Sequence, residues 1–118
     1  MIAIIDYGAG NIFSVKNALD YLGVENKLTA DRNEICAADE IILPGVGAFP
    51  WAMKMLRDSG LVDTIREEAK KKPFLGICLG MQLIFDKGYE FEETDGLRLI
   101  GGKVEKIDRK DMIIPHMG

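Results

Sequence analysis

The decisive stretch for the fold is Phe74-Leu75-Gly76-Ile77-Cys78-Leu79-Gly80-Met81-Gln82. Apolar residues lead into a small-residue turn that holds a cysteine, which is the pattern of a nucleophile elbow between a buried strand and a helix. A glycine lies two residues to each side of Cys78, where so tight a turn has no room for side chains. The pattern predicts a strained cysteine whose sulfur stands clear of the sheet, at the start of a helix over 79–85. Backbone N–H groups and the helix dipole favour the thiolate there.

A buried and inert cysteine is the commoner fate of this residue type in apolar sequence. The two flanking glycines favour the other interpretation for Cys78, a thiol nucleophile. Cys36 lies in Glu34-Ile35-Cys36-Ala37-Ala38, without a glycine turn or a basic neighbour, and is predicted to be a small packed residue.

Short apolar runs alternate with helical patterns around this stretch. The predicted strands are 2–5, 24–28, 41–43 and 74–77, and the predicted helices are 12–22, 50–58 and 61–69. Asn11 and Gly23 are the expected caps of the first helix. Beyond Gly88 we expect an acidic loop over 89–96 and a pair of short strands near Lys103–Ile107 and Met112–Pro115. The alternation predicts an α/β fold, a doubly wound and mostly parallel sheet with helices on both faces.

Ligands of such folds sit beyond the carboxyl ends of the strands, where turns 6–11 and 44–47 join the Cys78 turn. The glycines of Gly45-Val46-Gly47 let the backbone donate N–H groups to a developing oxyanion, and the N–H of Leu79 is the usual second donor. An ordinary glycine loop after a strand is the alternative. The cysteine beside it favours the oxyanion role.

The composition is that of a soluble intracellular domain. The 118 residues fit one domain, and the net charge of −4 with scattered basic residues argues against a nucleic-acid surface. The one basic cluster, Lys70-Lys71-Lys72, is predicted to interact with a helix C-terminus. Two cysteines show no disulfide framework and no metal-ligand spacing. No apolar run is long enough to span a membrane, so the cytoplasm is the expected compartment.

Four motifs, taken in order, resemble one family. The run Gly76-Ile-Cys-Leu-Gly-Met-Gln82 resembles the signature of the triad, or class I, glutamine amidotransferases. Three further segments narrow the resemblance to the glutaminase subunits of imidazole glycerol phosphate synthases: Asp6-Tyr-Gly-Ala-Gly-Asn11, Pro44-Gly-Val-Gly-Ala-Phe49 and Pro115-His-Met-Gly118. The resemblance implies a flavodoxin-like fold.

The resemblance also implies roles for residues. Cys78 would be the nucleophile that attacks the side-chain amide of glutamine. Gly45, Gly47 and Leu79 would border the oxyanion site, and Gln82 would help to hold the substrate. A γ-glutamyl thioester would form, and the released ammonia would pass to a (β/α)8-barrel cyclase partner in histidine biosynthesis. No cofactor and no metal are implied.

The family's catalytic histidine and glutamate lie beyond the position of Gly118. We therefore expect residues 1–118 to be the N-terminal part of a single amidotransferase domain, inactive alone, because His116 is the only histidine and aligns with a motif residue rather than the base. Unpaired sheet edges would then favour a homo-oligomer. The alternatives are a noncatalytic, self-associating half-domain and a different thiol enzyme with a similar elbow.

Overall fold

A four-stranded parallel sheet forms the centre of the computed structural model, which describes residues 1–8, 12–85, 87–88, 94–99 and 103–104. Its strands are β1 (Ile2–Ile5), β2 (Asn26–Thr29), β3 (Glu40–Gly45) and β4 (Phe74–Cys78), in the order β2-β1-β3-β4. The helices are α1 (Ile12–Tyr21), α2 (Arg32–Ala37), α3 (Phe49–Asp58), α4 (Val62–Ala69) and α5 (Leu79–Leu83). A second, small sheet joins β5 (Lys87–Gly88), β6 (Thr94–Asp95) and β7 (Lys103–Val104) in the order β6-β5-β7.

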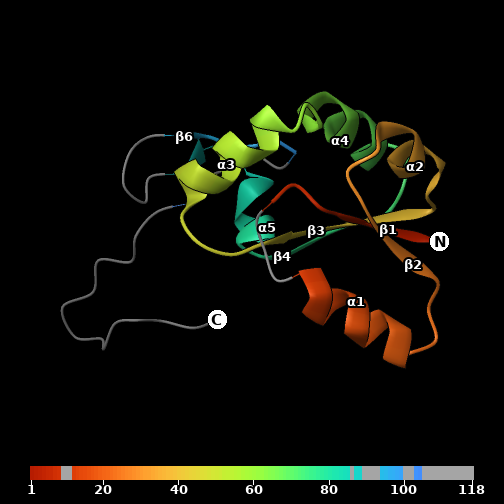
Figure 1. The fold of residues 1–118 in the computed structure, drawn as a ribbon. Coiled ribbons are helices and arrows are strands. Elements are labelled where there is room, and N and C mark those ends of the chain that lie inside the picture. The colour runs from red at the N-terminus through yellow and green to blue at the C-terminus, as the bar shows by residue number, and fades with distance from the viewer. Residues whose placement is uncertain (9–11, 86, 89–93, 100–102, 105–118) are drawn as a thin grey trace, which may run out of the picture.

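Helices cover both faces of the parallel sheet, as predicted, but unequally. Helices α2 to α5 lie on one face, and α1 lies alone on the other (Figure 1). The main core lies between the sheet and the larger helical layer, and its largest fully buried side chains include Ile5, Leu43, Phe49, Leu56 and Ile65. The doubly wound α/β prediction is confirmed.

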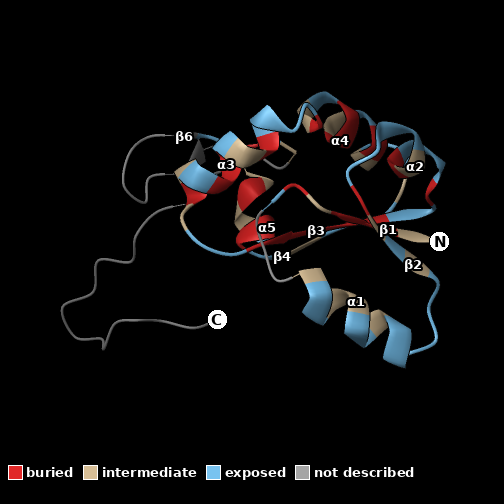
Figure 2. Ribbon diagram, in the orientation of Figure 1, coloured by how far each residue is buried: buried red, intermediate tan, exposed pale blue. Residues whose placement is uncertain are grey.

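The opposite face is less well covered by the residues described. No residue of α1 is buried, and Phe13 on this helix is 66% exposed (Figure 2). On the sheet itself, Leu75 of β4 is 55% exposed. The apolar pattern of 12–22 correctly predicted a helix, but that helix contacts the sheet without burying its apolar stripe.

Two predicted boundaries were wrong for reasons visible in the backbone. The strand expected at 24–28 begins at Asn26, because the N–H of Val24 donates to the carbonyl of Leu19 and still belongs to the turn that ends α1. The helix expected over 79–85 ends at Leu83. Carbonyl groups of 83–85 instead accept hydrogen bonds from the N–H groups of 97–99, at 2.7–3.0 Å.

Helix α2 was not predicted. Its N-cap is Asp31, whose side chain accepts a hydrogen bond from the N–H of Asn33, and Ile35 is its buried residue. Cys36 follows Ile35 on the helix and is exposed, so its predicted packing was wrong. The rotation of about 100° per residue in a helix separates the two side chains.

The part of the chain after α5 was predicted only roughly. Thr94 and Asp95 form β6 rather than part of a loop, and β7 matches the start of the strand expected at Lys103–Ile107. The predicted cap Asn11, residues 89–93 of the acidic loop, the strand Met112–Pro115 and His116 lie outside the described residues. Among the residues described, no helix combines the length and the apolar character needed to cross a bilayer.

Candidate functional site

The strand β4 runs directly into α5, and Cys78 is the residue between them. Its backbone has φ 56° and ψ −124°, and it is one of the non-glycine residues with positive φ. Residues other than glycine rarely adopt this backbone conformation, which costs about 1–3 kcal/mol and is found mainly where function requires it. Cys78 is exposed, as the elbow pattern predicted.

Close contact between α5 and the strands explains the glycines of the motif. A Cβ atom at Gly80 would overlap the carbonyl oxygen of Leu43. At Gly76 it would lie 2.7 Å from the Cα of Met81, and at Gly45 it would lie 2.6 Å from the nitrogen of Gly80. The helix therefore rests on the backbone of β3 and β4, and this approach sets the sharp turn at the cysteine.

A cavity of about 220 Å³ opens beside the cysteine at the carboxyl ends of β3 and β4. It is lined by Ser14, Val15, Pro44, Gly45, Val46, Ile77 and Cys78. Gly45 stands opposite Cys78 in the register of the two strands. The structure thus brings together the predicted nucleophile and one of the predicted oxyanion residues, next to a space of the size of a small ligand group.

Three other predicted site residues are not among those that line this cavity. Leu79 is buried directly after the nucleophile. Gly47 has φ 101°, and a Cβ placed on it would lie 3.7 Å from the indole of Trp51 in α3. Gln82 is partly buried in the same short helix as Leu79. Their predicted roles stay predictions.

Sequence reasoning missed the contribution of α1 to the cavity wall. Ser14 and Val15 come from the first turns of this helix. The apolar period of 12–22 predicts a helix, but nothing in that period separates a residue that faces the core from one that lines a cleft.

A buried tyrosine supports the strand end that carries Gly45. The hydroxyl of Tyr7 donates a hydrogen bond of 2.7 Å to the carbonyl of Pro44. Burial raises the pKa of Tyr7 to about 12, so the phenol keeps its proton at physiological pH. The segment 6–11 was predicted as a functional turn, but the sequence did not predict the hydrogen bond from Tyr7 to Pro44.

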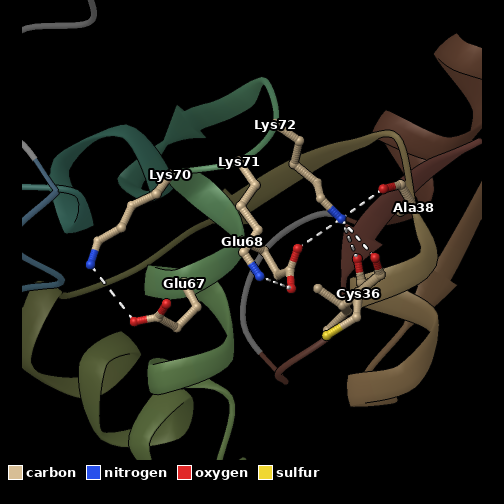
Figure 3. A network of polar contacts seen from close by, with 8 residues as sticks. Cys36, Ala38, Glu67, Glu68, Lys70, Lys71 and Lys72 are labelled. Atoms are coloured by element: carbon tan, nitrogen blue, oxygen red, sulfur yellow. Dashed lines mark hydrogen bonds and ion pairs between the residues drawn. The ribbon is translucent and has the colours of Figure 1, made fainter.

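The basic cluster 70–72 does meet a helix C-terminus, as Figure 3 shows for Lys72. Its ammonium group donates to the carbonyls of Ile35, Cys36 and Ala38 at 2.7–3.2 Å and lies 2.9 Å from the carboxylate of Glu68. These carbonyls lie at the C-terminus of α2 and not at that of α4, the helix that precedes Lys72. The sequence alone does not reveal which helix the lysine contacts. Lys72 thus satisfies backbone acceptors that a helix leaves open at its end.

Cys36 lies at the edge of this network and is not activated by it. A hydrogen bond to Glu68 is the main cause that raises the pKa of the Cys36 thiol. The hydrogen bond from Lys72 in turn holds the pKa of Glu68 below its usual value. A thiol with a raised pKa is a poor nucleophile at neutral pH, so the network points away from a second reactive cysteine.

Metal ligands are a separate question. Within the described ranges, no group of three or more His, Cys, Asp and Glu residues is placed to hold a metal ion.

Comparison with protein families identifies the chain. The model of the family described as glutamine amidotransferase class-I matches residues 3–115, which include the elbow and the cavity. The chain belongs to this family. This is the family that the motif Gly76–Gln82 resembles.

Three curated relatives of this amidotransferase chain carry the same name. A protein of Lacticaseibacillus casei strain BL23 named imidazole glycerol phosphate synthase subunit HisH is 56% identical over 120 residues. Proteins of the same name from Listeria monocytogenes serotype 4a and Bacillus thuringiensis are 51% identical. Each alignment includes all of this chain but only 56–58% of the relative's length.

Solved structures agree on the fold. A crystal structure titled glutamine amidotransferase superposes with a TM-score of 0.74 at 22% identity, covering 89% of this chain and 56% of that one. A putative peptidase E from Listeria monocytogenes superposes with a TM-score of 0.63 at 20% identity, covering 84% and 62%. At such identities the likeness concerns the fold alone.

Proposed function

We propose that this amidotransferase chain belongs to the glutaminase subunit of an imidazole glycerol phosphate synthase, an enzyme of histidine biosynthesis in the cytoplasm. The observation that carries the proposal is Cys78, exposed and strained at the elbow beside a cavity, with Gly45 opposite. The shared name of relatives at 51–56% identity supports the choice of synthase.

The first step is acyl transfer to sulfur. The Cys78 thiolate attacks the γ-carboxamide carbon of glutamine, and the carbonyl electrons move to the oxygen. The backbone at Gly45–Gly47 and the N–H of Leu79 stabilise that oxyanion, while Gln82 helps to hold the substrate. Collapse expels the amide nitrogen, which takes up a proton as it leaves and so becomes ammonia, and a γ-glutamyl thioester remains on Cys78.

The second step is hydrolysis of the thioester. Water attacks the acyl carbon, the sulfur leaves, and glutamate is released. Both steps need a group that moves protons, and such a group is typically worth ~10²–10⁴-fold in rate. In the proposal this group is a histidine, oriented by a glutamate, in a C-terminal part of the domain beyond residue 118.

The partner in the proposal is a (β/α)8-barrel cyclase that consumes the ammonia. Free ammonia is protonated in bulk water and then no longer reacts as a nucleophile. A sealed passage from the Cys78 cavity to the partner keeps it reactive. The proposal needs no metal and no cofactor in this chain.

A glutaminase assay tests the proposal. Glutamate release would be measured for residues 1–118 and for the same residues joined to the C-terminal part of the Lacticaseibacillus relative. We expect turnover from the joined chain, its loss in Cys78→Ala, and stimulation by the cyclase subunit of that organism. The 118-residue chain alone is expected to show at most slow acylation.

Two results would contradict the proposal. Turnover that survives Cys78→Ala would show that Cys78 is not the nucleophile. Full turnover by residues 1–118, abolished by both Cys78→Ala and His116→Ala, would make His116 the base and would overturn the division of the catalytic groups. A noncatalytic half-domain predicts no acylation in either chain, and a different thiol enzyme predicts acylation by other substrates.

A further inference from the structure

Tyr7 occupies an unusual place for a buried phenol. It follows β1, and its ring belongs to the core between the sheet and the helices, where it is 5% exposed. Its hydroxyl crosses to the neighbouring strand and donates to the Pro44 carbonyl, 37 residues away in sequence. A buried phenol needs such an acceptor, and a buried carbonyl needs such a donor.

The contact lies where the ladder between the two strands has ended. The register of β1 with β3 runs from Ile2 opposite Glu40 to Ile4 opposite Ile42. Beyond Ile5, the N–H of Asp6 donates instead to Thr29, on the side of β2. The Tyr7 hydroxyl therefore joins the β1 segment to β3 beyond their last backbone pair, three residues past Ile4 and two residues past Ile42.

Pro44 is the residue directly before the cavity turn. Gly45, the next residue, faces Cys78, and the chain then continues through Val46, which is exposed, to Gly47 with its positive φ. A displacement of the Pro44 peptide is thus transmitted directly to the backbone that faces the nucleophile. Misplacement by about 1 Å can cost ~10²-fold in an enzymatic rate.

We infer that Tyr7 is a positioning residue for acyl transfer: its hydroxyl holds the Pro44–Gly47 turn in register with Cys78, so that the turn can stabilise the oxyanion. The inference rests on the proposed function. Because burial raises the pKa of Tyr7 to about 12, this donor keeps its proton through the range in which amidotransfer is measured.

Trp51 provides a readout of this turn that does not depend on activity. It is the only tryptophan in the sequence, is 47% exposed, and lies beside Gly47. A looser turn would change the access of a quencher to its indole. Fluorescence from Trp51 therefore reports on the segment that Tyr7 is inferred to hold.

The test compares Tyr7→Phe with Thr29→Val in the full chain of 118 residues. Thr29 is also a buried hydroxyl, donating to Glu34 at 2.9 Å, but it lies at the end of β2, two strands from β3. The acylation probe is the p-nitrophenyl γ-ester of L-glutamate, whose leaving group needs no proton. The sulfur of Cys78 displaces p-nitrophenolate, and the thiol proton passes to the buffer. The γ-glutamyl thioester that forms is detected by intact mass spectrometry. Reaction with iodoacetamide measures the thiol itself, since that displacement forms no oxyanion.

In Tyr7→Phe we expect a limiting acylation rate about tenfold lower, with an unchanged half-saturating ester concentration. Iodoacetamide should modify Cys78 within about twofold of the original rate, and acrylamide should quench Trp51 more strongly. Thr29→Val should leave all three measurements unchanged.

Each other outcome counts against the inference. Acylation of Tyr7→Phe at the original rate, or an equal loss in Thr29→Val, would overturn the positioning role while the proposed function stands. A parallel loss of iodoacetamide reaction would mean that the hydroxyl supports the thiol rather than the turn. If the original chain forms no thioester at Cys78, this inference fails, whereas the proposed function is judged by the turnover of the joined chain.

Discussion

Cys78 is held in a backbone conformation that its own side chain disfavours. The register of β3 with β4 continues to the pair Gly45–Cys78, and α5 begins at the next residue. The ladder on one side and the helix on the other fix φ at 56°. The strain of about 1–3 kcal/mol is thus offset by packing elsewhere, and its result is a thiol raised above the strand ends.

Alkylation should distinguish the two exposed cysteines. Under limited iodoacetamide treatment near neutral pH, we expect Cys78 to be modified several-fold faster than Cys36, because the Glu68 carboxylate raises the pKa of Cys36. Peptide mass spectrometry measures both rates in one sample. Glu68→Gln should accelerate Cys36 and leave Cys78 unchanged. Faster modification of Cys36 in the original chain would refute the elbow argument.

Gly80 should tolerate no side chain. Gly80→Ala would drive a methyl group into the Leu43 carbonyl, and we expect a loss of about 1–3 kcal/mol in the free energy of unfolding, typical of overpacking. Gly60→Ala is the matched control, since a Cβ there meets nothing within 4 Å and only its φ of 75° opposes the change. Urea unfolding measures the free energy of unfolding of both variants. A Gly80→Ala chain as stable as the original chain would contradict the close contact of α5 with β3.

The elements of this fold differ in how readily the sequence predicts them. Buried strands such as β1 and β3 were predicted because parallel strands covered on both faces are continuous apolar runs. The short α2 was missed because six residues show no helical period. A usable signal was present in the cap Asp31 with Glu34 three residues later, the spacing of a capping box.

Other features could not be predicted because they depend on distant segments. The end of α5 is set by hydrogen bonds from residues 97–99. The carbonyls that Lys72 binds belong to a helix more than 30 residues earlier in the chain. In the candidate site, the cysteine and its glycines were predicted locally, whereas Ser14, Val15 and the Tyr7 contact arise from tertiary packing.

The ion pair of Lys72 with Glu68 should make stability depend on pH in the acid range. Because Lys72 lowers the pKa of folded Glu68 below the ordinary 4.5, the pair stabilises the fold above that value, and the contribution is lost as the pH falls through the lowered pKa. Melting temperatures of the original chain and Glu68→Gln should therefore differ most near neutral pH and converge on acidification.

Glu67→Gln is the matched control for this prediction. Glu67 is the neighbouring carboxylate, and it is exposed and 3.7 Å from the exposed Lys70. Surface pairs of this kind contribute little to stability. A difference in melting temperature between the original chain and Glu68→Gln that stays constant from about pH 7 to about pH 3 would show that the ion pair does not cause it.

The whole molecule is asymmetric about its sheet. One face carries most of the core, while the other is covered by α1 alone, and β2 and β4 have a neighbour on one side only among the described residues. An open edge beside exposed apolar residues such as Leu75 favours strand pairing between molecules.

We therefore expect the 118-residue chain to form dimers or larger assemblies. Leu75→Lys places a charge on the open face at β4 and should shift the population toward the monomer. Tyr21→Lys, also an exposed apolar residue but at the end of α1, should not. Light scattering over a range of concentrations measures the mass. A stable, compact monomer at high concentration would contradict the expectation.

The most direct test of the central claim, that Cys78 is the glutaminase nucleophile, is to map the site of a glutamine-mimicking electrophile. The chain joined to the C-terminal part of its Lacticaseibacillus relative would be treated with a glutamine analogue that carries a γ-diazoketone, and the adduct located by tandem mass spectrometry. We predict one adduct, on Cys78, formed more slowly when L-glutamine is in excess. Labelling that falls on Cys36, or labelling of Cys78 that glutamine does not slow, would contradict it.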